Sequence, residues 1–154
     1  MKRLAGNRLR LAGFTLLALC AAGAAAAAKQ PKGTNLLFTF VTNQAGFDTS
    51  LTIANTTQDP FGTTLIDGTC TLHFFGANAP APTETLVISA GTVFATLAST
   101  IAPGFQGYAI AECNILLLHG WAIVGDLGFQ NLGASYPALV IPPGKRKKLE
   151  RLDE

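Results

Sequence analysis

The sequence has few charged residues and, over most of its length, no positive charge. Only 13% of its 154 residues are Asp, Glu, Lys or Arg, about half of the ~25% that is usual in soluble globular proteins. Residues 33–144 contain no lysine and no arginine, and their only charged side chains are acidic: Asp48, Asp59, Asp67, Glu84, Glu112 and Asp126. A segment without cations cannot neutralise phosphates, so we expect no nucleic-acid partner.

The sequence also lacks the short motifs that mark common catalytic and cofactor sites. It has no G-x-S-x-G for a serine nucleophile, no H-E-x-x-H or C-x-x-C for zinc, and no glycine-rich loop that would hold a nucleotide phosphate. No sustained heptad of apolar residues is present, which excludes a coiled coil. We therefore expect no cofactor, no bound metal and no enzymatic activity.

Two weaker alternatives to this expectation stay open. A small hydrolase or metalloprotein would need the only two histidines, His73 and His119, to meet Glu112 and Asp126 in space. A calcium site would have to draw on Asp48, Asp59 and Asp67, but they lie in separate predicted turns without a D-x-D-x-D loop. Aspartate is common in turns for structural reasons, and that reading is favoured.

Residues 1–28 have the organisation of a secretory signal peptide. Basic residues (Lys2, Arg3, Arg8 and Arg10) precede a short apolar stretch, and small residues end the segment at Ala28. Residues 11–28 are uncharged and are long enough for an uncleaved membrane helix, but the stretch is rich in alanine and only weakly apolar. A lipid anchor on Cys20 is another alternative, although Leu19 is bulky where lipoproteins have a small residue.

Composition divides the rest of the chain into three parts. Residues 29–34 form a short linker, residues 35–141 a domain, and residues 142–154 a charged tail that begins with Pro142, Pro143 and Gly144. Removing residues 1–28 leaves seven cations and nine anions, a net charge of −2. The tail is interpreted as a solvated segment, with tethering to an anionic envelope surface as the alternative. No membrane-spanning segment is expected after cleavage.

The domain shows the period-two alternation of β-strands. Leu51 and Ile53 alternate with polar residues, and Cys70, Leu72 and Phe74 do the same. Similar alternation runs through residues 36–40 and 93–97, where it places Phe40, Val93, Ala95 and Leu97 with the apolar sets. Residues 105–118 and 121–124 are predicted to be buried on both sides, with His119 in a tight turn, and residues 134–141 to complete the fold.

Turn signals rich in glycine, proline, asparagine and aspartate separate these runs. About eight short strands without an amphipathic helix predict an all-β fold, an antiparallel β-sandwich of immunoglobulin-like size. A small β-barrel is the alternative. Ten phenylalanines can supply the core, so the aromatic residues are interpreted mainly as core residues.

Cys70 and Cys113 are the only cysteines in the domain. In an exported protein, an even pair in predicted strands indicates one disulfide. Asn55, Thr56 and Thr57 match a glycosylation sequon, which matters only in a host that performs the modification.

Several segments resemble a family of uncharacterised exported bacterial proteins. The resemblance is strongest in residues 38–49 and 53–56 and continues in residues 59–63, 68–72, 74–76, 103–108, 119–121 and 126–128. It implies bacterial export and a β-sandwich. No established activity accompanies it, so it assigns no functional residue.

These observations predict an exported bacterial protein that acts as a non-catalytic surface, adhesive or structural module with an envelope or extracellular protein or glycan as partner. It would be secreted, periplasmic or on the cell surface. A subunit of an extracellular assembly, joined by β-strand addition at an edge near Leu51, is the second hypothesis.

Intact mass measurement of the native protein tests the predictions on export and the disulfide. We expect a chain that starts at Lys29 and takes up two alkyl groups only after reduction, because Cys20 leaves with the signal peptide. A lipid-modified chain starting at Cys20, or alkylation without reduction, would contradict these predictions.

Overall fold

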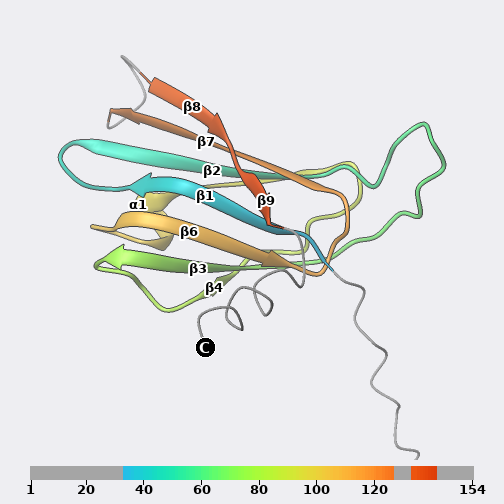
Figure 1. The fold of residues 1–154 in the computed structure, drawn as a ribbon, viewed down its shortest axis with the longest axis horizontal. Helices are drawn as coiled ribbons and strands as arrows, with labels where there is room; N and C mark the ends of the chain where they lie inside the picture. The colour runs from blue at the N-terminus through green and yellow to red at the C-terminus, as the bar shows by residue number, and fades with distance from the viewer. Residues whose placement is uncertain (1–32, 127–132, 142–154) are drawn as a thin grey trace, which may run out of the picture.

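The computed structural model describes residues 33–126 and 133–141, which form two antiparallel sheets packed face to face (Figure 1). One sheet has the strand order β4-β3-β6-β1-β9, with bounds β4 (Thr83–Glu84), β3 (Cys70–Ala77), β6 (Gln106–Cys113), β1 (Asn35–Thr42) and β9 (Leu139–Ile141). The other has the order β5-β2-β7-β8, with bounds β5 (Val93–Leu97), β2 (Phe47–Asn55), β7 (Leu118–Asp126) and β8 (Gly133–Pro137). A single helical turn, α1 (Ala98–Ile101), follows β5.

This architecture confirms the all-β antiparallel sandwich, and the sheets do not close into the alternative barrel. The predicted signal peptide (1–28), residues 29–32 of the linker and the tail (142–154) lie outside the described residues. Within the described residues, no helix has the length and apolar character needed to cross a membrane.

The core fills the space between the sheets with alternate residues of the central strands. Leu51 and Ile53 of β2 and Leu72 and Phe74 of β3 point inward, as the alternation predicts. The Phe74 ring packs edge-on against Phe105, with centroids 5.3 Å apart. Each side chain of this size contributes about 2 kcal/mol when it leaves water, so this interdigitation is the main source of stability.

Three expectations about which way strand residues face are wrong. A bulge in β1 shifts the register between Phe38 and Val41, which turns Phe40 to the surface with 45% of its area exposed. β5 points Val93, Ala95 and Leu97 outward, and Phe94 is its inward residue. Residues 105–118 and 121–124 are not buried on both sides, since Tyr108 of β6 and Trp121 and Ile123 of β7 are exposed.

The edge predicted near Leu51 is also wrong. β2 pairs with β5 along one side and with β7 along the other, so its backbone groups are used in two ladders. Its polar Ser50 and Thr52 lie on the outer face of a central strand, where Thr52 is buried. Any strand addition must therefore occur elsewhere.

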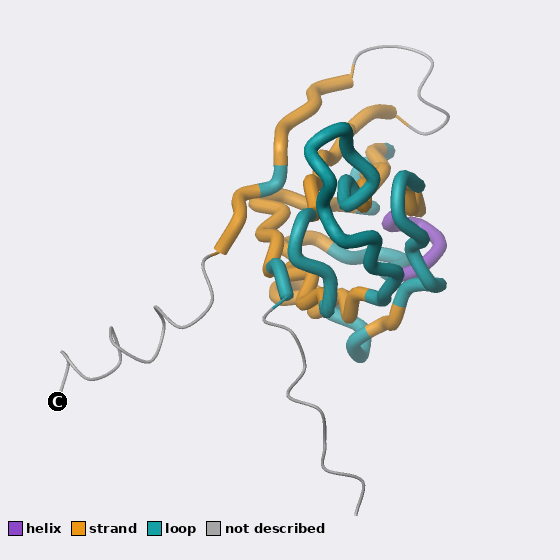
Figure 2. The backbone as a smooth tube through the Cα atoms, turned by 90° about the vertical axis from the view of Figure 1, so that its right-hand side faces the viewer, coloured by secondary structure: helices purple, strands orange, loops and turns teal. Residues whose placement is uncertain are grey.

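One side of the sandwich is covered by a strand that changes sheets. β8 pairs with β7, and after Ala138 the chain continues into β9, which pairs with β1 (Figure 2). The Ala138 amide donates to the Gly120 carbonyl at 2.7 Å. The Tyr136 hydroxyl donates to the Phe40 carbonyl across the two sheets, and burial raises the pKa of this phenol. Residues 134–141 thus complete the fold, as predicted.

The disulfide joins neighbouring strands of one sheet. Cys70 in β3 lies directly opposite Cys113 in β6, and the two sulfurs are bonded. Immunoglobulin domains instead link their two sheets with the conserved bridge. Closing a loop with a sequence separation of 43 restricts the unfolded chain and is worth ~4 kcal/mol in the chain-entropy treatment.

The side chain of Asn55, the last residue of β2, forms hydrogen bonds with two segments that precede and follow β3 in the sequence. Its amide nitrogen donates to the carbonyls of Ile66 and Ile88 at 2.7 and 2.9 Å. Its side-chain oxygen accepts from the backbone amide and the hydroxyl of Thr57. The residue is 1% exposed, so the sequon nitrogen of the folded protein is not accessible to a glycosyl donor.

Replacing Asn55 with alanine should lower the free energy of unfolding by about 3 kcal/mol, because buried carbonyls and an amide lose their partners. Thr56→Ala is the matched control, since it removes only an exposed hydrogen bond to the Leu117 carbonyl. Urea unfolding of the two variants measures the difference. Equal midpoints for both variants would contradict the structural role of Asn55.

Candidate functional site

The structure brings together only two of the four side chains considered for catalysis. His73 in β3 and Glu112 in β6 lie on the outer face of the five-stranded sheet, with His73 Nε2 3.5 Å from Glu112 Oε2. His119 and Asp126 lie in β7 of the other sheet. His119 pairs with Ala54 within the strand, so its prediction as a turn residue is wrong. The proposed convergence of the four groups does not occur.

The three aspartates considered for calcium are each engaged locally. Asp48 lies in β2, so its prediction as a turn residue is wrong. It is buried and accepts from the amides of Thr49 and Ser99 and from the Ser99 hydroxyl. Asp67 accepts from the Ala90 amide at 2.8 Å.

Asp59 organises the tip of the loop between β2 and β3. It accepts from the amides of Phe61 and Thr63 and from the Thr63 hydroxyl. The hydroxyl contact is the main cause that lowers the pKa of Asp59. The carboxylate therefore stays ionised and shapes the turn.

Across residues 33–126 and 133–141, no three His, Cys, Asp or Glu side chains are grouped as a metal site requires.

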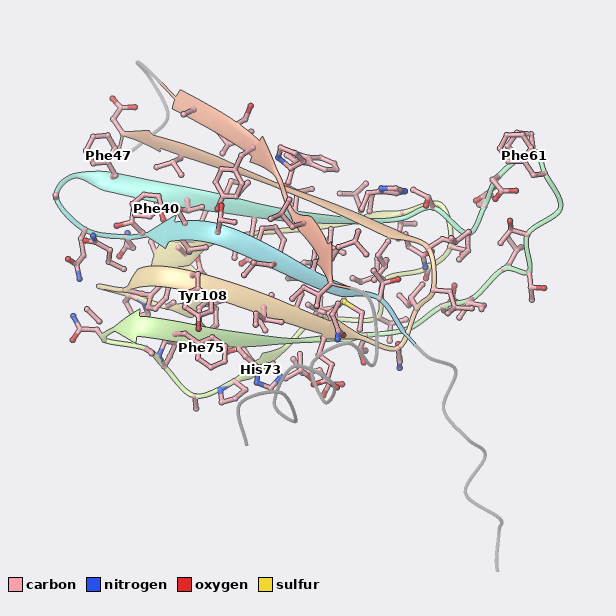
Figure 3. All side chains as sticks on the ribbon, viewed as in Figure 1. Phe40, Phe47, Phe61, His73, Phe75 and Tyr108 are labelled. Atoms are coloured by element: carbon pink, nitrogen blue, oxygen red, sulfur yellow. A yellow bond between two sulfur atoms is a disulfide. The ribbon has the colours of Figure 1, made fainter. Side chains whose placement is uncertain are left out.

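Aromatic side chains gather on the outer face of the five-stranded sheet. Phe75 of β3 lies opposite Tyr108 of β6, and the two rings stack with centroids 5.0 Å apart and an interplanar angle of 15° (Figure 3). Both residues have 42% of their surface exposed. Stacking fixes the orientation of the two rings, so little side-chain freedom remains to be lost when a ligand covers them.

Two adjoining shallow depressions border this aromatic pair. The larger, ≈ 320 Å³, is lined by Asn35, His73, Phe75, Ile110 and Glu112. The other, ≈ 280 Å³, is lined by Leu37, Thr39, Tyr108 and Ile110. Ile110 lines both, so the depressions adjoin at β6. Their sizes lie near the lower limit for small-ligand sites.

The polar groups of this face are suited to hydrogen bonding with a neutral ligand. His73 Nε2 is buried and has no hydrogen-bond partner among the described residues, whereas the Glu112 side chain 3.5 Å away is 71% exposed and can accept hydrogen bonds from a ligand. Asn35 adds an amide and Thr39 a hydroxyl at the rim. The sequence places no lysine or arginine in residues 33–144, so an anionic ligand would meet no lysine or arginine of the described residues.

Sequence reasoning did not single out Phe75 and Tyr108, because it assigned the aromatic residues mainly to the core. A usable signal was present in the Phe74-Phe75 dipeptide. Two successive residues of a strand point to opposite faces, so one of the two rings had to lie on the outer surface.

Comparison with known protein families, curated protein sequences and solved structures gave no match for this chain. The resemblance to exported bacterial proteins therefore remains a prediction, and the candidate site rests on the geometry of the chain itself.

We expect millimolar calcium chloride to leave the thermal unfolding midpoint unchanged relative to the protein in EDTA. The reason is that Asp48, Asp59 and Asp67 already accept hydrogen bonds and do not face one another. Thermal unfolding followed by circular dichroism tests this, with magnesium chloride at equal ionic strength as the control. A rise of the midpoint specific to calcium would contradict it.

Proposed function

We propose that the chain is an exported, non-catalytic binding module that holds a neutral glycan on the outer face of its five-stranded sheet. The observation that carries this proposal is the stacked Phe75–Tyr108 pair, which lies between two adjoining depressions. The residues that would contact the ligand come from β1, β3 and β6, three adjacent strands of a rigid sheet.

Export is supported by two independent features. Residues 1–28 have the pattern of a secretory signal. The Cys70–Cys113 disulfide is compatible with an oxidising compartment such as the periplasm or the extracellular space.

A neutral glycan fits the chemistry of the face better than the other polymers met outside a cell. A sugar ring offers apolar C–H groups to aromatic and aliphatic side chains and hydroxyls to polar ones. The face supplies both, since Phe75, Tyr108 and Ile110 lie beside Asn35 and Glu112. Nucleic acids and acidic polysaccharides require cations, which residues 33–144 lack.

A hydrolytic role has less support. His73 and Glu112 form a pair 3.5 Å apart, but no described serine, cysteine or second acid lies with them in the depression. Glycoside hydrolysis ordinarily uses two carboxyl groups that flank the scissile bond, and this depression holds one. The exposed Glu112 carboxylate is better suited to accepting hydrogen bonds from ligand hydroxyls.

The double variant Phe75→Ala/Tyr108→Ala tests the proposal. We expect the processed wild-type protein to bind at least one member of a panel of neutral polysaccharides, namely soluble α- and β-glucans, mannan, cellulose and chitin. Affinity electrophoresis measures the soluble polymers and pull-down the insoluble ones. The double variant should bind about tenfold more weakly, since it loses two aromatic contacts.

Phe47→Ala is the matched control, because Phe47 is similarly exposed (47%) and lies in β2 of the other sheet. It should retain wild-type binding, and the acidic polysaccharide alginate should not bind. The proposal fails if no neutral polymer binds, or if Phe47→Ala weakens binding as much as the double variant does.

A further inference from the structure

The described sandwich has four edge strands, and three of them carry features that discourage pairing with another chain. β4 has two residues and follows Pro80 and Pro82. β9 has three residues and precedes Pro142. β8 ends in Pro137 and continues into β9 along the same side (Figure 2). Short length and proline are the usual protections of an edge strand.

β5 has none of these protections. Its five residues, Val93–Leu97, include no proline, no glycine and no charged side chain. Its register with β2 is regular from Ser50↔Leu97 to Ala54↔Val93, without a bulge. It forms the outer strand of its sheet on the side away from β8. Natural proteins rarely leave a flat apolar edge of this kind without a partner.

The alternation of the ladder shows which backbone groups of β5 are open. The Asn55 amide donates to the Thr92 carbonyl at 3.0 Å. In an antiparallel pair, every second residue bonds to the same neighbour. The backbone groups of Thr92, Phe94 and Thr96 therefore face β2. Val93 and Ala95 direct their N–H and C=O groups to the open edge, and Leu97 directs its N–H there, since its carbonyl caps α1.

The sequence of β5 is complementary to itself in the antiparallel sense. With Ala95 opposite the same residue of a second copy, Val93 lies opposite Leu97, and Phe94 lies opposite Thr96. Large aliphatic residues thus meet at the two ends and the smallest residue lies at the centre. The strand has no charge, so no like charges would face each other within it.

We propose that β5 is a homotypic interface, through which two copies pair antiparallel about a two-fold axis at Ala95. The two four-stranded sheets then join into one sheet of eight strands, and the open backbone groups of β5 gain partners. This interface lies on a different sheet from the glycan-binding face, so the two proposals stand or fall separately. The proposal also moves the site of strand addition to β5 from β2, where the sequence analysis predicts it.

Charge substitution at Ala95 tests the interface and its register. Ala95 is exposed and points outward, so Ala95→Lys and Ala95→Glu should both fold. Each should convert the processed protein from dimer to monomer in sedimentation velocity, because like charges then lie directly opposite each other. Mixing the two variants in equal amounts should restore a dimer, because opposite charges then meet at the axis.

Ser135→Lys is the matched control. Ser135 is exposed on β8, the opposite edge strand of the same sheet, so the added charge should leave the dimer intact. Circular dichroism checks that all three variants fold. A wild-type protein that stays monomeric at its solubility limit would overturn the proposal, as would a strand added only by a different protein.

Two further outcomes are decisive. If Ser135→Lys dissociates the dimer as Ala95→Lys does, β5 is not the interface. If the Lys and Glu variants stay monomeric when mixed, the two-fold register at Ala95 is wrong. Hydrogen exchange gives an independent readout: the amides of Val93, Ala95 and Leu97 should become protected as concentration rises, and those of Phe94 and Thr96 should be protected throughout.

Discussion

The segment between residues 33 and 144 has no lysine and no arginine, and its aspartates Asp48, Asp59 and Asp67 are hydrogen-bonded without them. Carboxylates that would pair with a cation in most domains accept hydrogen bonds from backbone amides and hydroxyls instead, as Asp48 and Asp59 do. These bonds attach α1 to β2 and shape the loop that carries Phe61. The acidic side chains thus have structural roles that other proteins give to salt bridges.

Stability must then come from packing, backbone ladders and covalent constraint. Phe74 and Phe105 anchor the core between the sheets, and the Cys70–Cys113 bond fixes the register of the two strands that hold most of the candidate site. The side chain of Asn55 forms hydrogen bonds with Ile66 and Ile88, which lie in segments outside the named strands. The disulfide thus also supports the candidate site, since β3 and β6 carry the stacked aromatic pair. The same lack of cations leaves the candidate site and the edge strand β5 without a lysine or arginine of their own.

The sequence predicted the sandwich well where apolar and polar residues alternate cleanly, as in β2 and β3. It failed where both faces of a strand carry apolar residues, because alternation defines two faces but not which one is inside. β5 is such a strand, and Val93 and Leu97 point outward for that reason. A bulge cannot be read from alternation either, so Phe40 was assigned to the wrong face.

The candidate site was harder to predict than the fold, since Phe75 and Tyr108 are 33 residues apart in sequence and meet only through the pairing of β3 with β6. The most direct test of the account is a nuclear magnetic resonance titration of the processed, isotope-labelled protein with an oligosaccharide of the neutral polymer that it binds. The account predicts that the largest amide shifts fall on β1, β3 and β6 around His73, Phe75, Tyr108 and Ile110. Shifts centred on the other sheet or on the Phe61 loop, with none on this face, would contradict it.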